Sequence, residues 1–207
     1  MKTILCYGDS NTWGAVPNEN RRYDLHERWA GVLRDALGGG FWLIEEGLSG
    51  RTTVHSDPIE GAHKNGLTHL PAVLESHVPL DLVIIMLGTN DLKMRFSVSA
   101  FDIAQGAGTL VHAIQQGTWG NVPHVLLIAP PPLTKLTYFA DMFAGGVEKS
   151  RQFAAEYRRV AGELNCAFFD AGTVVTTSDG DGVHWEAEDH RKLGFALVDV
   201  VRALLNS

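Results

Sequence analysis

Cysteine and long apolar runs are scarce in this sequence of 207 residues. The two cysteines, Cys6 and Cys166, are too few for a disulfide framework, and each lies in or beside an apolar segment, as a small buried hydrophobe would. No apolar stretch approaches the roughly 20 residues that a membrane span needs, and "MKTILCYGDS" lacks the apolar core and cleavage site of a signal peptide. We therefore expect a cytoplasmic protein that does not associate with membranes.

Positive charge is limited as well. The 17 lysines and arginines are outnumbered by 24 aspartates and glutamates, which gives a formal net charge of −7, and no basic block interrupts this balance. The charge argues against nucleic acid as a partner. With 45% hydrophobic and 20% charged residues the composition is that of a globular protein, and the length suits one hydrophobic core. We expect a single domain over residues 1–207.

Five short apolar runs are spread along the chain. Each is rich in aliphatic or aromatic residues and is short enough to be a strand buried on both faces of a sheet. The runs occupy residues 3–7, 41–46, 82–87, 124–129 and 167–170.

Helical patterns lie between these runs. Asp24 with Glu27, and Ser99 with Asp102, have the spacing of a capping box and predict two helix starts. The last segment has an apolar stripe at helical spacing, formed by Leu193, Ala196, Leu197, Val200, Val201 and Leu204. Strands that alternate with helices imply parallel pairing and helices on both faces. The predicted fold is α/β: a three-layer α/β/α sandwich around a five-stranded parallel sheet, with flavodoxin-like topology.

Polar and glycine-rich interruptions follow four of the predicted strands. They read "GDS", "GLSG", "GTND" and "PPP" in chain order. Parallel sheets of this kind bind ligands beyond the carboxyl ends of their strands, where these interruptions would meet. Ser10, in the first of them, is therefore expected at the functional edge of the sheet.

A serine hydroxyl becomes a nucleophile only with a base and a carboxylate that orients the base. Asp181 precedes His184 by three residues in a glycine-rich turn, a spacing that lets the carboxylate reach Nδ1 and leaves Nε2 as an acceptor. Asp179 is a competing carboxylate, five residues before His184. Each of these residues alone more often serves as a turn or cap residue. Their combination favours acyl transfer.

Acyl transfer also needs donors for the oxyanion that forms on the carbonyl oxygen. Gly50 can offer an unhindered backbone N–H, and Asn90 can offer a side-chain amide. The backbone N–H of Ser10 would be the third donor. A turn glycine and a helix cap are the ordinary interpretations of Gly50 and Asn90 taken one at a time.

These motifs resemble the four blocks of the SGNH hydrolases, also called GDSL-type esterases. The matching segments are "GDSNTWG", "GLSGRTT", "GTND" and "DGVHW", and the resemblance covers nearly the whole chain. It implies the SGNH hydrolase fold and a site without a metal ion or organic cofactor. It also implies a catalytic triad of Ser10, Asp181 and His184, and an oxyanion hole of Ser10, Gly50 and Asn90.

Within the family, the sequence looks most like the mycobacterial arylesterase and acyltransferase branch. That likeness implies hydrolysis of short-chain or aryl esters through an acyl-enzyme, with water or an alcohol as acceptor, acyltransferase and perhydrolase activity, and a homo-oligomer such as a tetramer or octamer. The chain has Asn11 where the family name has leucine. It has Ala15 where the branch has tryptophan, and Gly50 where the branch has alanine. These departures suggest a wider pocket mouth and a different ratio of hydrolysis to transfer.

The pocket walls are expected from residues beside the motifs and after the fourth strand. They are Thr12, Trp13, Lys93, Phe139, Phe143, Val183 and Trp185. For the aromatic residues, packing in the core or between subunits is an equally good interpretation.

Three other classes of protein share part of this pattern. A flavodoxin-like small-molecule binding domain without hydrolase activity would share the topology, but no glycine-rich phosphate-binding motif follows the first strand. An α/β-hydrolase would carry G-x-S-x-G, which is absent. A scaffold without catalysis, assembling through the polar segment 18–28, would not need the candidate triad.

Overall fold

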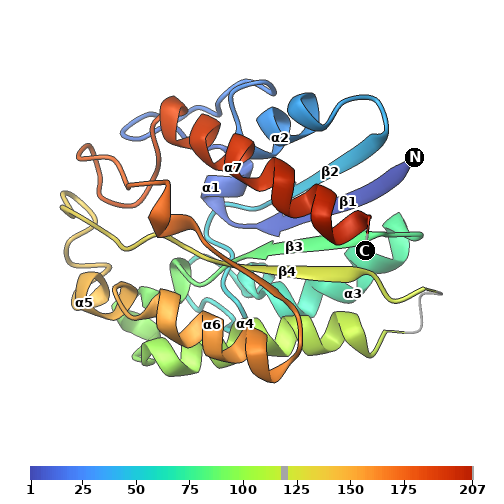
Figure 1. Ribbon diagram of the computed structural model, residues 1–207. Helices are drawn as coiled ribbons and strands as arrows, with labels where there is room; N and C mark the ends of the chain where they lie inside the picture. The colour runs from blue at the N-terminus through green and yellow to red at the C-terminus, as the bar shows by residue number, and fades with distance from the viewer. Residues whose placement is uncertain (118–120, 207) are drawn as a thin grey trace.

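The computed structural model describes residues 1–117 and 121–206 and has a sheet between two layers of helices (Figure 1). The sheet has five strands in the order β2-β1-β3-β4-β5, and every pair is parallel. The strands are β1 (Lys2–Gly8), β2 (Phe41–Gly47), β3 (Leu82–Met86), β4 (His124–Ala129) and β5 (Ala167–Asp170). The predicted three-layer sandwich is confirmed, and each predicted strand agrees to within one residue at either end.

The helices form two layers. In Figure 1, α2 and α7 lie on one side of the sheet, and α3, α4 and α6 lie on the other. The α-helices are α1 (Ser10–Trp13), α2 (Trp29–Leu37), α3 (Gly66–His77), α4 (Ala100–Gln115), α5 (Gly146–Ser150), α6 (Phe153–Glu163) and α7 (Ala187–Leu205). Short 3₁₀ helices are η1 (Ala62–Lys64), η2 (Asn90–Leu92), η3 (Met94–Phe96) and η4 (Ala171–Thr173).

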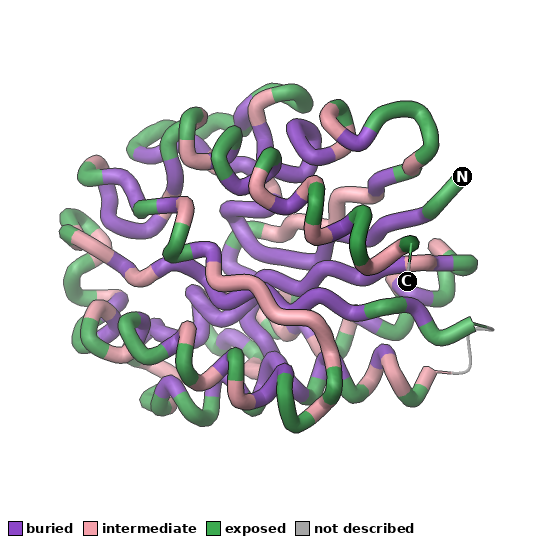
Figure 2. Tube along the Cα trace, viewed as in Figure 1, coloured by how far each residue is buried: buried purple, intermediate pink, exposed green. Residues whose placement is uncertain are grey.

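Alternating side chains of each central strand enter two separate cores. Leu5 and Tyr7 pack with residues of α3, α4 and α6, whereas Ile4 and Cys6 pack with residues of α2 and α7. Figure 2 shows the central strands buried along their length. Burial on both faces explains why these strands read as unbroken apolar runs in the sequence.

Two of the sequence signals for helices are confirmed. The apolar stripe near the C-terminus becomes the buried side of α7, where Leu193, Leu197 and Val201 are fully buried. Ser99 and Asp102 form the expected reciprocal capping box at the start of α4.

The capping box predicted at Asp24 and Glu27 is wrong as a helix start. Glu27 does accept the backbone N–H of Asp24 at 2.9 Å, but α2 begins only at Trp29. Arg28 interrupts the turn because its backbone is extended and its guanidinium is drawn inward to Glu45 Oε2 at 2.7 Å. A buried ion pair thus overrides the local capping signal.

The carboxyl ends of the strands converge at one edge of the sheet. The chain leaves β1, forms β2 on one side of it, and returns to form β3 on the other side. The strand order therefore reverses at β1, which is where ligands bind in sheets of this kind. Ser10 follows β1 directly.

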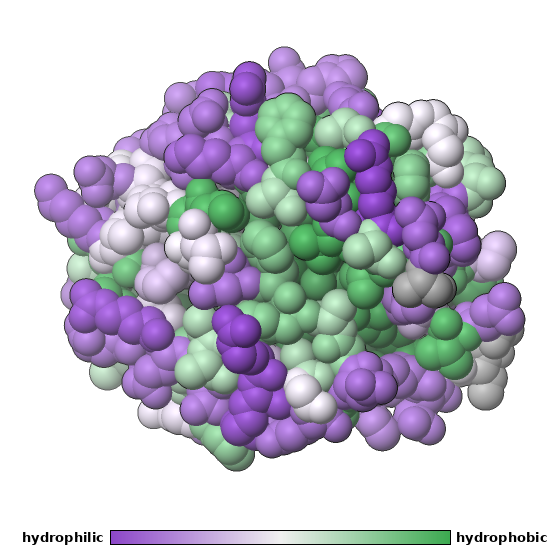
Figure 3. All heavy atoms as spheres, viewed as in Figure 1, coloured by the Kyte–Doolittle hydropathy of each residue, from purple (hydrophilic) through white to green (hydrophobic). Residues whose placement is uncertain are grey.

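The edge strands β2 and β5 are less covered than the three central strands. All four residues of β5 are partly exposed, and Figure 3 shows apolar side chains gathered in the middle of this view, between α6 and α7. Within residues 1–117 and 121–206, none of the helices has the length and apolar character needed to cross a membrane.

Candidate active site

Ser10 lies where β1 ends and α1 begins. Asp9 caps this helix, since its Oδ1 accepts the backbone N–H of Asn11 at 3.0 Å, and Ser10 is the first helical residue. The turn is tight, because a Cβ at Gly8 would lie 2.0 Å from Thr12 Oγ1. This local geometry holds the serine hydroxyl at the carboxyl end of β1.

A histidine and an aspartate from the far end of the chain complete the arrangement. His184 Nε2 lies 3.1 Å from Ser10 Oγ, across 174 residues of sequence, and His184 Nδ1 lies 2.8 Å from Asp181 Oδ2. Because an ionised carboxylate only accepts hydrogen bonds, Nδ1 carries the proton and Nε2 is left to accept the serine proton. The competing Asp179 is exposed, and His184 pairs with Asp181 instead.

Asp181 is fully buried and is held in an ionised form. The backbone N–H groups of Val183 and His184 both donate to its Oδ1 at 2.8 Å. Gly182 makes this turn possible with a φ of 77°, and a Cβ there would lie 2.6 Å from the Lys135 backbone. Burial alone would raise the pKa of Asp181, but the hydrogen bonds from His184 and Val183 outweigh it and keep the pKa below its usual value.

Two further donors line the same cavity as Ser10 and His184. Gly50 lies in the turn after β2 with a φ of 81°, and its backbone N–H has no acceptor among the described residues. Asn90 begins η2, and its Nδ2 donates one hydrogen to the Arg51 carbonyl oxygen at 3.1 Å, which leaves its second amide hydrogen available. The Ser10 N–H is likewise available, because the first N–H of a helix has no intrahelical partner.

The cavity of about 220 Å³ beside Ser10 is lined by apolar and by charged side chains. The apolar residues are Phe139, Met142, Phe143 and Val183. The polar residues besides the catalytic group are Ser49, Glu60, Lys64 and Lys93. Phe139 also packs edge-on against the His184 ring, with centroids 6.0 Å apart. A small ester can therefore meet an apolar and a polar surface in one cavity.

Lys93 and Glu60, two of the charged side chains of the cavity, form an ion pair, whereas Lys64 Nζ donates to the Ser49 carbonyl oxygen at 2.8 Å. Lys93 is only 3% exposed, and its Nζ lies 2.5 Å from Glu60 Oε1 and 3.7 Å from Asp57 Oδ2. Arg95 binds the fully buried Asp57 at 2.9 Å. Burial of the Lys93 ammonium is tolerated because two carboxylates compensate its charge.

Two side chains of the cavity wall lie close to Gly50. A Cβ there would lie 2.5 Å from Glu60 Oε2 and 3.2 Å from Lys64 Cε. The Glu60 and Lys64 side chains thus fill the space that an alanine methyl group would need.

Three residues expected in the pocket wall lie elsewhere. Thr12 is fully buried beneath the site. Trp13 packs under Arg22, whose guanidinium carbon lies 5.3 Å from the ring centroid. Trp185 is fully buried against His190, with ring centroids 5.2 Å apart. The remaining four expected residues line the cavity.

Four of the lining residues are not among the site residues expected from the sequence; they are Ser49, Glu60, Lys64 and Met142. Ser49 adjoins Gly50, and Met142 lies between two expected aromatic residues, so adjacency could have found both. Glu60 and Lys64 come from the long connection between β2 and α3, which bends at Gly61 with a φ of 115°. In the sequence, Glu60 and Lys64 appear as two opposite charges four residues apart. Such pairs are common on protein surfaces, so the spacing does not identify them as cavity residues.

Asp9, next to the nucleophile, is a buried carboxyl group. It is 2% exposed, and burial raises its pKa to about 6. A carboxyl group whose pKa rises on folding favours the protonated form in the folded state. Protonation of Asp9 therefore stabilises the fold. This stabilisation is complete below the pKa that Asp9 has in the unfolded chain, and it is lost as the pH rises through the pKa that Asp9 has in the folded protein.

Replacing Asp9 by asparagine is expected to stabilise the fold at neutral pH. Asparagine keeps an oxygen that can cap α1 and removes the buried charge. The free energy of unfolding should exceed that of the wild type by up to about 3 kcal/mol at neutral pH, and the difference should vanish near about pH 4. Urea unfolding at both pH values measures it.

A matched control for this experiment is Asp170→Asn. Asp170 also accepts the N–H two residues later, that of Gly172 at 2.9 Å, but it does so from a partly exposed position. It should show no gain that depends on pH. An Asp9→Asn difference of the same size at both pH values would contradict the account.

Comparisons with known proteins agree with this geometry. A profile of the GDSL-like lipase/acylhydrolase family matches residues 6–195. A search of curated protein sequences gives no match.

Solved structures are similar over the full chain. A carbohydrate acetylesterase family member from Sinorhizobium meliloti is 45% identical, with all of both chains covered and a TM-score of 0.96. Est24, a carbohydrate acetylesterase from the same species, and the native aryl esterase of M. smegmatis are each 44% identical. Both have a TM-score of 0.95, with 99% of this chain and 100% of the other covered.

Proposed function

Because this chain belongs to the GDSL-like lipase/acylhydrolase family and is a carboxylic ester hydrolase, we propose that it cleaves short-chain or aryl esters through an acyl-enzyme on Ser10. The resemblance to the SGNH hydrolases is thereby confirmed. The alternative of a binding domain without hydrolase activity is set aside.

The observation that carries the proposal is the continuous hydrogen-bonded path from Ser10 through His184 to Asp181. In the proposed reaction His184 Nε2 takes the Ser10 proton while Oγ attacks the ester carbonyl. His184 then returns the proton to the departing alcohol, which leaves the acyl group on Ser10. A water molecule, activated by the same imidazole, releases the acid.

The negative charge that develops on the carbonyl oxygen needs nearby donors. We assign this role to the backbone N–H groups of Ser10 and Gly50 and to the Asn90 amide. Two observations support the assignment. Ser10, Gly50 and Asn90 line one cavity, and the Gly50 N–H has no acceptor among the described residues. Donors fixed by the fold stabilise such an oxyanion without reorganising during the reaction.

The cavity size favours short acyl groups. A volume of about 220 Å³ beside Ser10, bounded by Phe139 and Phe143, leaves little room for a long chain. Across p-nitrophenyl esters from acetate to octanoate, we expect kcat/KM to be highest for the short esters and at least about tenfold lower for octanoate. Equal or higher kcat/KM for octanoate would contradict the assigned acyl pocket.

A second candidate concerns the alcohol part of the ester. Glu60, Lys64 and Lys93 add hydrogen-bonding groups to the cavity, and these suit hydroxyl-rich alcohols such as acetylated sugars. The likeness to carbohydrate acetylesterases supports this candidate. Acetate release from an acetylated sugar, measured beside the aryl series, decides between a carbohydrate and an aryl preference.

Acyl transfer to alcohols and perhydrolysis stay proposals that the family resemblance supports. The same holds for assembly into a tetramer or octamer. The partly exposed edge strand β5 and the apolar side chains gathered near it in Figure 3 are compatible with contacts between copies.

A further inference from the structure

The proposed oxyanion donors come from two separate parts of the chain. Gly50 belongs to the loop of residues 48–55 after β2, here called the Gly50 loop, whereas Asn90 begins η2 after β3. A donor misplaced by about 1 Å can lower an enzymatic rate by about 10²-fold. The Gly50 loop must therefore be held in a fixed position relative to η2.

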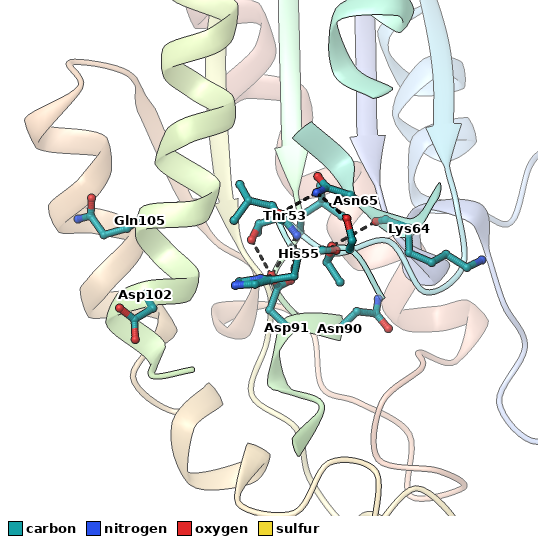
Figure 4. A network of polar contacts seen from close by, with 12 residues as sticks. Thr53, His55, Lys64, Asn65, Asn90, Asp91, Asp102 and Gln105 are labelled. Atoms are coloured by element: carbon teal, nitrogen blue, oxygen red, sulfur yellow. Dashed lines mark hydrogen bonds and ion pairs between the residues drawn. The ribbon is translucent and has the colours of Figure 1, made fainter. Parts of the chain in front are cut away.

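Asp91, the residue after Asn90, joins these two segments. It is fully buried. Its Oδ1 accepts the hydroxyl of Thr53 at 2.6 Å and lies 2.9 Å from His55 Nδ1, and both oxygens accept the Thr53 backbone N–H at 3.1 and 3.0 Å. Figure 4 shows Thr53 and His55 directed at Asp91, with Asn90 beside it. Within the described part of the chain, every hydrogen-bonding partner of this carboxylate thus belongs to the Gly50 loop.

Asn90 is tied to the same loop. One hydrogen of its amide goes to the carbonyl oxygen of Arg51, one residue after Gly50. Arg51 is itself held, because its Nη1 donates to the carbonyl oxygen of Gly8 at 2.9 Å and its guanidinium lies 4.0 Å from the Tyr7 ring centroid. The Asn90 amide can therefore turn its second hydrogen to the substrate only while the Gly50 loop keeps its position.

The burial of Asp91 is compensated by the donors around it. Hydrogen bonding to Asp91 is the main cause that raises the pKa of His55, so a charged imidazolium is favoured beside the carboxylate. From α4, Gly106 approaches Thr53 so closely that a Cβ would lie 2.4 Å from Thr53 Oγ1. The helix thereby confines Thr53, which limits how far the loop can move.

We propose that Asp91 is a positioning residue that fixes the Gly50 N–H and the Asn90 amide in one oxyanion hole, through its hydrogen bonds to Thr53 and His55. The proposal rests on the function proposed above. Asp91 does not touch the substrate in this account. Its effect on the rate passes through the two donors.

The test is a double-mutant cycle of Asp91→Asn with Asn90→Ala. The amide oxygen of asparagine can take the place of Oδ1, but its Nδ2 then replaces Oδ2 and faces the Thr53 backbone N–H, so that two donors oppose each other. The negative charge beside His55 is also lost. We expect kcat for p-nitrophenyl acetate to fall about 10- to 100-fold in Asp91→Asn, with KM changed less than about twofold. Asn90→Ala alone should lower kcat by about 10²- to 10³-fold.

The double variant separates positioning from general damage. If Asp91 acts through the oxyanion hole, Asp91→Asn should cost little more, within about threefold, once the Asn90 amide is gone. If the fold-decrease in kcat of the double variant equals the product of the two single decreases, the proposal is overturned. A kcat of Asp91→Asn equal to that of the wild type would also overturn it. Normal kcat in Asn90→Ala would instead contradict the proposed oxyanion hole itself, so the two failures are distinguishable.

Two further variants guard against a trivial result. Asp81→Asn is the matched control, because Asp81 accepts the Thr3 backbone N–H at 2.8 Å and pairs with Lys2 at the opposite end of the sheet. Its kcat should equal that of the wild type. If Asp91→Asn does not fold, Thr53→Val removes only the shortest bond to Asp91 and should lower kcat about three- to tenfold with the same KM. An unchanged kcat in a folded Thr53→Val would count against the proposal.

Discussion

Replacing Ser10 by alanine is expected to lower the kcat for p-nitrophenyl acetate by about 10⁴-fold or more, to near the uncatalysed rate. The Ser10 hydroxyl lies 3.1 Å from His184 Nε2, where it can act as the nucleophile, and without Oγ no acyl-enzyme can form. Stopped-flow or steady-state release of p-nitrophenol measures the loss.

The Ser10→Ala variant should remain folded. Alanine is a good helix former, and Asp9 still caps α1 through the N–H of Asn11. Circular dichroism and thermal unfolding should match those of the wild type. Turnover within about tenfold of the wild type by a folded variant would refute Ser10 as the nucleophile.

Replacing Asp181 by asparagine is expected to lower kcat by about 10³- to 10⁴-fold. The N–H groups of Val183 and His184 both point at Oδ1, so the new amide should keep its oxygen there and turn Nδ2 toward the imidazole. Nδ1 must then accept a hydrogen bond, and the proton moves to Nε2. An imidazole in that tautomer cannot accept the Ser10 proton.

Asp179→Asn is the matched control for Asp181→Asn. Asp179 lies two residues earlier in the same turn but is exposed, and it does not pair with His184. Its kcat should stay within about twofold of the wild type. A large loss in Asp179→Asn together with a small loss in Asp181→Asn would reverse the assignment of the carboxylate.

The sheet could be predicted from the sequence because its strands are buried on both faces. Such strands appear as unbroken apolar runs, and the runs ended within one residue of the strands in the structure. The apolar stripe of α7 was equally clear, since one side of that helix covers a core. Both signals come from burial, which composition and spacing record directly.

Local sequence signals did not predict the helix start correctly where a residue distant in the sequence influences the backbone. Asp24 and Glu27 have capping-box spacing, but the turn that follows Asp24 ends at Arg28, whose backbone is extended and whose guanidinium binds Glu45, and α2 begins only at Trp29. Glu45 lies on β2, and nothing in the segment around Asp24 reveals that contact.

The pocket walls were predicted least well because neighbours in an irregular segment point in different directions. Trp185 follows His184 directly, yet its ring packs in the core against His190 while His184 faces the cavity. Glu60 and Lys64 reach the cavity only because the connection between β2 and α3 folds back at Gly61. Adjacency in sequence therefore identifies the motif residues but not the walls around them.

The proposed mechanism depends most on which residue carries the acyl group. Labelling with a fluorophosphonate, followed by peptide mapping with tandem mass spectrometry, locates that residue directly. We predict a single adduct on Ser10 in the wild type and none in Ser10→Ala. An adduct on any other serine, or equal labelling of the alanine variant, would contradict the account.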